Sequence, residues 1–305
     1  VVICTKDRPV ALRRCLLALL ENQWLPSEVV VVDQGQFTTD PPVQAAFAER
    51  EIVLRHEAMQ TSGVSRGRNL GITLSTADFI AFTDDDCVPD TGWLGALFKA
   101  CTTGVDGASG RILPLPASDP DLVAVSSRTS PIARLYQGVS PHAPWDVGSG
   151  GNLLLRRAAL KHVGGFDERL GPGAPGRAAE DIDLLYRLLI AGFTIAYEPG
   201  AVVYHEMKTR QARLRSRFPY GYGMGAFLAT HISKDDGYAR MLFRRYLRFH
   251  AGSFLGGLRH LDRWQMKETA WTCIGALWGA VSWRHAINTR TLSKEYPTSH
   301  KGNRE

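Results

Sequence analysis

Phe79-Ile-Ala-Phe-Thr-Asp-Asp-Asp86 joins a short apolar run to three consecutive carboxylates. The apolar run predicts a buried strand that ends at the aspartates. Three carboxylates at one strand end repel one another and lose hydration, so a fold that gathers them there usually supplies a cation. That cation would in turn hold an anionic ligand. Taken alone, the triplet can also be interpreted as a solvated acidic turn that caps the strand.

The composition is that of a globular protein. The chain has 305 residues, of which 44% are hydrophobic and 22% charged, which is enough for one large domain or one domain with an appendage. Five scattered cysteines without paired spacing predict neither a disulfide framework nor a zinc site, and they fit a reducing cytoplasmic setting. A formal net charge of +6 favours anionic partners such as nucleotide phosphates, acidic lipid or nucleic acid, without choosing among them.

The first part of the chain alternates strand and helix patterns. Strands are predicted at 1–4, 29–32, 52–54 and 79–82, and helices from Pro9 onward and at Val64–Leu74. This alternation predicts a parallel, layered α/β sheet. Ligands of such sheets bind beyond the carboxyl ends of the strands, which is where Thr5, Asp7, Asp33 and the aspartates fall. We therefore expect the polar residues to converge on one edge of the sheet.

The middle of the chain is less regular. Residues 114–144 predict an irregular excursion, and a glycine-rich stretch at 148–152 precedes an apolar run. A helix is predicted to begin near Ala178, with Asp181 pointing inward on the same face as Leu184, Leu185 and Leu188. Two further strands are predicted at 193–197 and 201–205, on either side of a turn at Glu198-Pro-Gly200.

The last third is basic and aromatic. Cations recur with mostly helical spacing over residues 208–267, whereas residues 270–283 are nearly uncharged. This apolar run is shorter than the roughly 20 residues that a bilayer-spanning helix needs. Residues 208–305 therefore predict a helical C-terminal region. Attachment to an anionic membrane surface, packing as an appendage and contact within a homo-oligomer all remain open for it.

Several motifs resemble those of the family 2 glycosyltransferases, and they occur in the same order. Residues 1–110 are similar to the nucleotide-sugar half of that family and residues 111–207 to its acceptor half. The resemblance implies a GT-A fold, a Rossmann-like mixed α/β sheet flanked by helices, over residues 1–207. The motifs are Val1-Val-Ile-Cys-Thr5 with Lys6-Asp-Arg-Pro9, Val32-Asp33, Gly63-Val-Ser-Arg-Gly-Arg-Asn-Leu-Gly71, Phe82-Thr-Asp-Asp-Asp86, Gly151-Asn152, Gly164-Gly-Phe-Asp-Glu168, Glu180-Asp-Ile-Asp183 and Glu198-Pro-Gly-Ala-Val-Val-Tyr-His205.

The resemblance also implies a task for each residue of the donor site. A Mn²⁺ or Mg²⁺ ion would be held by Asp84, Asp86 and His205, and would bridge the diphosphate of an activated sugar. Gln34 stands where many members carry a second aspartate, which leaves the identity of the base open. Asn69 is expected to support the loop. The predicted donor and nucleotide contacts are Thr5, Asp7, Asp33, Arg68, Asp84 and Asp85.

On the acceptor side, Asp181 resembles the catalytic base, which removes a proton from the acceptor hydroxyl as this oxygen attacks. Glu180 is expected to orient the acceptor, and Trp145 and Asn152 to contact it. Asp183 is predicted to pair with Arg187 at the surface. The segment Gly171-Pro-Gly-Ala-Pro-Gly176 is interpreted as a mobile cover or as an ordinary flexible loop.

Together these motifs predict an inverting, metal-dependent glycosyltransferase. It would transfer sugar from a nucleoside diphosphate donor, UDP-linked by preference, to a glycan or lipid-linked acceptor during cell-surface polysaccharide synthesis. No nucleic acid partner is expected. The location would be the cytoplasm, with peripheral attachment at the inner face of the cell membrane.

Three alternatives remain at this point. Asp84-Asp-Asp-Cys-Val88 also fits the Asp-x-Asp-x-Val pattern of haloacid dehalogenase-like phosphatases, with Asp84 as nucleophile, although that motif normally lies on the first strand. A dinucleotide-dependent oxidoreductase is disfavoured, because no Gly-x-Gly-x-x-Gly follows Cys4. A basic module that binds membrane or nucleic acid without catalysis would use the sheet only as a scaffold.

Overall fold

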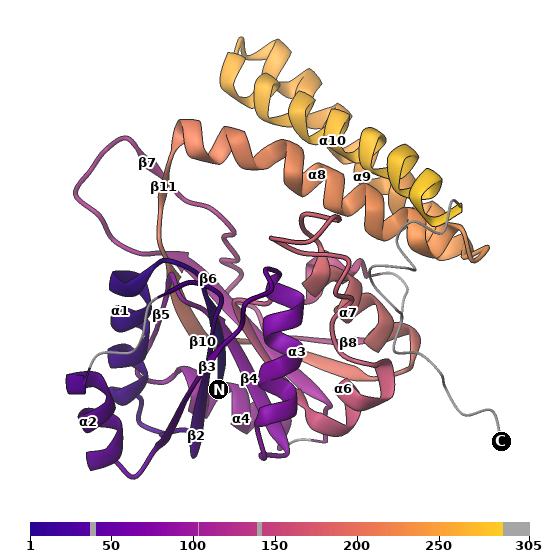
Figure 1. Cartoon of the computed structure of the whole chain (residues 1–305). Coiled ribbons are helices and arrows are strands. Elements are labelled where there is room, and N and C mark those ends of the chain that lie inside the picture. The colour runs from indigo at the N-terminus through magenta and orange to yellow at the C-terminus, as the bar shows by residue number, and fades with distance from the viewer. Residues whose placement is uncertain (37–40, 103, 139–141, 289–305) are drawn as a thin grey trace, which may run out of the picture. The chain divides into compact units, whose positions relative to one another are not determined.

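Figure 1 shows a computed structural model that describes residues 1–36, 41–102, 104–138 and 142–288. The chain forms two compact units. The first comprises Val1–Phe166 and Leu184–Lys208, and the second comprises Asp167–Asp183 and Thr209–Glu305. In the described part of the first unit, nine strands form one mixed sheet in the order β3-β2-β1-β4-β9-β6-β10-β5, with β8 also paired to β10. The predicted mixed α/β architecture is therefore confirmed.

The strands of this sheet are short except for β10. They are β1 (Val2–Thr5), β2 (Glu28–Asp33), β3 (Val53–Ala58), β4 (Phe79–Asp84), β5 (Cys87–Pro89), β6 (Gly107–Pro114), β8 (Arg134–Gln137), β9 (Asn152–Arg156) and β10 (Thr194–His205). A second, two-stranded pairing joins β7 (Leu122–Val123) and β11 (Lys208–Thr209). The helices between the strands are α1 (Pro9–Leu20), α2 (Pro41–Glu49), α3 (Val64–Leu74), α4 (Trp93–Cys101), α5 (Pro144–Val147), α6 (Arg157–Val163) and α7 (Glu180–Ile190).

The parallel half of the sheet follows the predicted alternation. Strands β3, β2, β1 and β4 run parallel, and helices α1, α2 and α3 connect them in chain order. The register places Thr5 beside Asp33 on one side of β1 and Cys4 beside Asp84 on the other. The carboxyl ends of β1, β2 and β4 therefore meet at one edge, so their polar residues converge there as expected.

Hydrophobic residues cover both faces of the sheet because alternate strand positions point to opposite sides. Val29 and Val31 of β2 face one core, which α1, α2 and α4 complete. Val30 and Val32 face a second core, to which α6 and α7 contribute buried leucines. Each core extends beneath several strands. The ends of these strands are therefore held in fixed positions, where they can form a binding site.

The antiparallel half differs from the prediction at β10. This strand is continuous over Thr194–His205 instead of forming two strands around a turn. Pro199 and Gly200 lie within a register shift, a bulge-like irregularity in the pairing of β10 with β6 between Glu198 and Val202. Gly110 of β6 makes the irregularity sterically feasible, because a Cβ at that position would collide with the backbone of Ala201.

Residues 114–144 contain more regular structure than predicted. Strand β8 pairs antiparallel with β10 and adds an edge to the sheet, and β7 is a two-residue strand. Their sequences lack the alternation that identifies longer strands, since the burial pattern of β8 has a single buried residue, Tyr136.

The second unit is built mainly from three helices, α8 (Arg210–Ile232), α9 (Gly237–Arg259) and α10 (Arg263–Asn288). Helices α8 and α10 run parallel in close backbone contact. A Cβ at Gly221 or Gly225 of α8 would collide with the backbone of α10, and a Cβ at Gly275 or Gly279 would collide with that of α8. Glycines four residues apart on both helices thus form the contact. Among the described helices, none combines the length and apolar character required to cross a membrane.

The predicted domain boundary and the observed units differ in one segment. The sequence groups residues 167–183 with the sheet, whereas the structure groups Asp167–Asp183 with the C-terminal helices. Gly223 of α8 lies directly against the backbone of Ala178, which is one reason for this grouping. The unit boundary falls within α7, after its first turn.

Candidate active site

The aspartate triplet, Asp84–Asp86, lies where the chain leaves β4 and enters β5. Strand β5 pairs antiparallel with β10, and this register places Cys87 beside His205. The backbone N–H of Glu206 also donates to the carbonyl of Asp86 at 3.0 Å. Segments more than a hundred residues apart in the sequence are thus joined by backbone hydrogen bonds at the triplet.

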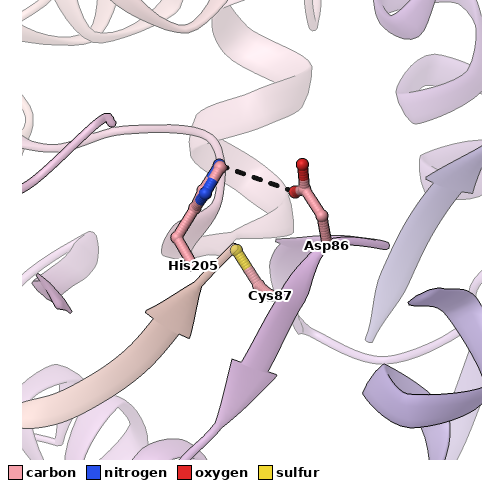
Figure 2. A group of neighbouring side chains, drawn as sticks. All are labelled: Asp86, Cys87 and His205. Atoms are coloured by element: carbon pink, nitrogen blue, oxygen red, sulfur yellow. Dashed lines mark ion pairs between the residues drawn. The ribbon is translucent and has the colours of Figure 1, made fainter. Parts of the chain in front are cut away.

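Asp86 and His205 present acceptor atoms to each other. His205 Nε2 lies 3.5 Å from Asp86 Oδ1, the contact drawn as a dashed line in Figure 2, and both side chains are buried. His205 Nδ1 lies 2.8 Å from the carbonyl oxygen of Glu206, to which it donates its proton. This bond directs the lone pair of Nε2 toward the carboxylate, the arrangement that metal-ligating histidines generally show. The pair fits a divalent cation between the two atoms.

Cys87 completes a group of three potential ligands. The ligand atoms of Asp86, Cys87 and His205 all lie within 4.8 Å of one another. Burial raises the pKa of the Cys87 thiol well above its usual range, and the neighbouring aspartates Asp84 and Asp86 add to this effect. A thiol with a raised pKa is a poor ligand, since metals bind the thiolate. The remaining carboxylate and imidazole suit Mn²⁺ or Mg²⁺.

Arg8 neutralises two of the three aspartates. Its Nη1 donates to Asp85 Oδ1 at 2.7 Å and to Asp86 Oδ2 at 2.9 Å, and its Nη2 reaches Glu206 at 3.0 Å. Arg14 also pairs with Glu206. Asp86 therefore shares its two oxygens, with Oδ2 bound to Arg8 and Oδ1 facing His205. Sequence motifs alone indicated no task for Arg8, Arg14 or Glu206, although Arg8 lies within the motif Lys6-Asp-Arg-Pro9.

Burial and the guanidinium oppose each other in setting the acidity of the triplet. Burial raises the pKa of Asp85 to about 6, although Arg8 and the Thr5 hydroxyl both act to lower it. Burial also acts to raise the pKa of Asp86, but His205 and Arg8 outweigh it, so that the pKa of Asp86 is lowered. Asp86 is therefore the better anionic ligand, while Asp85 accepts a 2.8 Å hydrogen bond from Thr5 Oγ1.

Arg68 holds the third aspartate. Its Nη2 donates to Asp84 Oδ1 at 2.8 Å, its guanidinium lies 5.2 Å from the centre of the Phe166 ring, and the side chain is buried. Gly150 and Gly151 pass so close to this ion pair that a Cβ on either would collide with it. Arg68 is thus a structural part of the site, and its alternative as a solvated helix residue is wrong.

The predicted nucleoside contacts lie at the ends of β1 and β2. Asp33 is buried, accepts from Gly35 N at 2.8 Å and lies 3.2 Å from His56 Nε2. Asp7, exposed and with a positive φ of 54°, is adjacent to Gly35. Gln34, in the place of a second aspartate, bonds through its amide to both backbone groups of Gly63 and so fixes the start of α3.

The acidic first turn of α7, formed by Glu180, Asp181 and Asp183, lies in the second unit. Glu180 and Asp183 are buried, whereas Asp181 is only half-buried, so the inward orientation predicted for Asp181 applies to its neighbours instead. Asp181 Oδ1 accepts from Ile182 N at 2.8 Å. Asp183 Oδ1 lies 2.8 Å from Nε2 of His231, also buried. Asp183 is therefore not at the surface, where its pairing with Arg187 was predicted.

The two remaining predicted acceptor contacts differ in their surroundings. Trp145 is half-buried in α5, and its carbonyl accepts from Arg128. Asn152 is completely buried and bonds to the Trp93 indole and to two backbone carbonyls, those of Arg111 and Ala201. Because all three side-chain hydrogen bonds of Asn152 serve the sheet, we withdraw its prediction as an acceptor contact. Asn69 bonds to both backbone groups of Phe166, in agreement with a supporting role.

The sheet order and the aspartate edge define the GT-A class of glycosyltransferase folds. Staphylococcus aureus TarS, residues 1–349, superposes with a TM-score of 0.59 at 15% identity, covering 95% of this chain and 90% of that one. The mannosyltransferase PcManGT of Pyrobaculum calidifontis, solved with GDP-Man and Mn²⁺, gives a TM-score of 0.51 at 16% identity, covering 97% and 81%. These likenesses establish the fold.

Sequence comparison establishes the family. The model described as "Glycosyl transferase family 2" matches residues 1–164, and "Glycosyltransferase like family 2" matches residues 132–250. The chain belongs to the family 2 glycosyltransferases. This result replaces the phosphatase, oxidoreductase and non-catalytic alternatives.

Two curated relatives illustrate the range of the family. Pre-mycofactocin glycosyltransferase of Mycobacterium tuberculosis is 30% identical over 233 residues, which is 75% of this chain but 47% of that protein. The chain thus spans about half the length of that relative. Succinoglycan biosynthesis protein ExoM of Rhizobium meliloti is 28% identical over 236 residues, 74% of each chain.

Proposed function

We propose that this chain is a metal-dependent, inverting glycosyltransferase that uses a nucleoside diphosphate sugar, by preference UDP-linked. One observation carries the proposal, namely that Asp86 Oδ1 and His205 Nε2 face each other at 3.5 Å while Nδ1 of the same imidazole bonds to the carbonyl of Glu206, which makes Nε2 of the neutral imidazole available as a ligand. Two lone pairs directed at one point attract a cation. The cation would be Mn²⁺ or Mg²⁺, and the PcManGT structure with GDP-Man and Mn²⁺ supports this choice.

The metal would supply Lewis acidity, offsetting the charge that develops on the departing diphosphate. The residues around it have separate tasks. Asp84, Asp85 and Asp86 are anchored by Arg8 and Arg68, so their oxygens are already oriented when the donor binds. This fixed arrangement avoids reorganisation during the reaction.

The nucleoside would bind against the ends of β1 and β2. Asp33 offers an oxygen for the ribose or the base, and Thr5 and Asp7 border the same edge. Arg68, paired with Asp84 beside the two glycines, would stand next to the phosphates. We propose these residues as the donor site.

Asp181 would remove the proton from the acceptor hydroxyl. A single displacement, with the acceptor oxygen attacking opposite to the diphosphate, inverts the anomeric configuration. Asp181 is half-buried in the first turn of α7, whereas Asp183 is buried against His231. Glu180 and Trp145 would orient the acceptor, and the glycine-rich segment 171–176 would cover it.

The acceptor would be a glycan or a lipid-linked glycan in the synthesis of cell-surface polysaccharide. The relation to ExoM, a protein of succinoglycan biosynthesis, supports this setting. We place the enzyme in the cytoplasm, peripherally attached at the inner face of the cell membrane. A homo-oligomer is compatible with this arrangement, and nucleic acid is not proposed as a partner.

Titration calorimetry of UDP and GDP, each with Mn²⁺ or with chelator, tests the proposal. We expect UDP to bind more tightly with Mn²⁺, and the enhancement to disappear in His205→Ala and Asp86→Asn. Asp90→Asn is the matched control, because this carboxylate follows β5 and, within the described part of the chain, accepts from the nearby Gly92 N. Equal binding with Mn²⁺ and with chelator would overturn the metal dependence. Tighter binding of GDP would overturn the choice of UDP.

A panel of nucleotide sugars then identifies the donor by slow hydrolysis in the absence of acceptor. We expect release of nucleoside diphosphate from one UDP-sugar, dependent on Mn²⁺ or Mg²⁺. Hydrolysis of none of the panel by a folded protein that binds UDP would contradict the proposed donor class.

A further inference from the structure

One face of α10 is both apolar and exposed. Five of its side chains, spaced three or four residues apart, share this face: Trp271, Ile274, Leu277, Trp278 and Val281. Each is about half exposed or more, and Trp278 reaches 61%. Large aromatic and aliphatic side chains so exposed on one helix face indicate a surface that binds a partner.

Basic residues lie at both ends of this apolar face. Arg263 and Lys267 precede it, and Arg284 and His285 follow it, all of them exposed. Over the described side chains of α10, every exposed residue is therefore apolar or basic. The opposite side of the helix carries Gly275 and Gly279, which pack against α8. Trp271, at the start of the face, also contacts Phe218 of α8, with ring centroids 6.1 Å apart, yet it remains 47% exposed.

Helix α9 continues the same pattern. Its exposed residues include Met241, Phe249 and Leu255 among the cations Arg244, Arg245 and Arg248. Between Gly237 and Asn288 the sequence contains only two acidic residues, Asp262 and Glu268. Asp262 accepts from the first backbone N–H groups of α10, and Glu268 pairs with Arg213 at 2.6 Å. Glu268 is thus neutralised by a cation, and the single exposed acid, Asp262, offsets only a small part of the exposed positive charge.

We propose that α10, with α9 beside it, docks the protein on an anionic lipid bilayer. Tryptophan and branched aliphatic side chains enter the boundary between headgroups and acyl chains, while arginine and lysine bind the anionic headgroups. Figure 1 shows α9 and α10 next to each other, so both helices can contribute to one surface. The inference assigns particular residues to the peripheral attachment and does not depend on the reaction catalysed.

Two other occupants fit less well. A second copy of the chain would bring the same cations against one another across a two-fold interface, which disfavours association. A nucleic acid would satisfy the cations but would leave Ile274, Leu277 and Val281 against a charged backbone, where they gain little. A bilayer surface alone satisfies both the apolar and the basic residues.

Vesicle flotation of the complete chain tests the inference, with vesicles of phosphatidylcholine alone or mixed in equal amounts with phosphatidylglycerol. We expect binding to the mixed vesicles only, weakened by salt. The double variant Trp271→Ser, Trp278→Ser should lose about tenfold or more in partitioning, because the buried apolar area falls. Lys267→Gln and Arg284→Gln should each lose about fivefold. No donor or acceptor is present, so the result is independent of sugar transfer.

Trp24→Ser is the matched control, since Trp24 lies in the first unit and is 57% exposed, close to Trp278. It should leave vesicle binding unchanged. A second measurement, made on the unmodified chain, is quenching of tryptophan fluorescence by brominated lipid in the mixed vesicles, which is expected to be strong. Absence of both flotation and quenching would overturn the inference. A second outcome would also overturn it. If the natural chain formed a concentration-dependent dimer, bound no lipid, and became monomeric in the Trp271→Ser, Trp278→Ser variant, the face would bind a second copy of the chain.

Discussion

The aspartate triplet and the acidic first turn of α7 each place three carboxylates near the end of a secondary-structure element, yet they balance that charge differently. In the triplet, guanidinium groups from Arg8 and Arg68 bind all three aspartates. In α7, Asp183 is paired with the His231 imidazole, and Asp181 accepts from the backbone of its own helix. The triplet, whose carboxylates already bind guanidinium cations, suits a site that can also bind a metal cation. In α7, Asp183 has a structural hydrogen bond, whereas Asp181 is half-buried and bonds to the backbone.

The number of carboxylates does not show whether a cluster binds a ligand or stabilises the fold. The burial of each carboxylate and the identity of its partner do. Asp86 is buried but keeps one oxygen directed at an imidazole lone pair, so it can bind an ion. Asp183 is equally buried, and its imidazole partner lies within normal hydrogen-bond distance. The following predictions test whether the comparison holds.

The largest effect is expected from Asp181→Asn. If Asp181 is the base, kcat should fall about 10²-fold to 10⁴-fold, because the amide cannot accept the proton. Binding of UDP with Mn²⁺ should not change, which calorimetry can establish beside a transfer assay. A variant with normal turnover would remove Asp181 from the chemistry and leave α7 a purely structural element.

Removal of the metal should have the next largest effect. Chelation should lower the rate of transfer by about 10³-fold, the equivalent of several kcal/mol of Lewis-acid stabilisation. Added Mn²⁺ should restore it in the natural chain but not in Asp86→Asn. Full activity in chelator would show that Arg8 and Arg68 suffice to stabilise the leaving group.

Asp183→Asn should act on stability. Replacing one partner of the buried Asp183–His231 pair should lower the free energy of unfolding by about 1–3 kcal/mol, because a buried polar atom loses its partner. Urea denaturation of this variant, of His231→Gln and of the double variant measures the coupling. If the Asp183→Asn variant kept its stability but lost sugar transfer, Asp183 would have a role in catalysis and not the structural role that the comparison assigns to it.

The smallest effect is expected from Arg8→Gln, in binding of Mn²⁺ without nucleotide. Removing the guanidinium cation from Asp86 should tighten this binding about fivefold, since a like charge no longer competes for the carboxylates. Electron paramagnetic resonance of free Mn²⁺ provides the measurement. Arg14→Gln is the control, because Arg14 pairs with Glu206, which lies outside the triplet. An equal change in both variants would mean that only the total charge matters.

The parallel half of the fold was predictable because local patterns agree there with the tertiary structure. The bounds of α3 match the prediction, and α1 begins at Pro9 as expected. Strand β10 was not predictable, because Pro199-Gly200 is typical of a turn and only the neighbouring Gly110 allows the irregular pairing. The deciding residue lies in another strand, which a local pattern cannot show.

Within the site, the sequence identified the residue types but not their partners. Asp84 to Asp86 and His205 were recognised from motifs, and the structure brings Asp86 and His205 together. The pairing of Asp183 with His231 spans 48 residues and follows no helical or strand spacing, so pattern analysis favoured the nearby Arg187. Asn152 was assigned to the acceptor from its motif, whereas its side chain accepts from the indole of Trp93, 59 residues away in the sequence.

Because His205 lies at the end of β10, we expect ion binding to stabilise the pairing of this strand in the sheet. Strand β10 is bonded to β6, β8 and β5 along its length, so these pairings hold the backbone that carries the imidazole. An ion held by Asp86 and His205 would therefore slow amide hydrogen exchange along the strand and raise the melting temperature by mass action. Slower exchange would extend from the ligand toward Thr194, some distance from any atom that touches the ion.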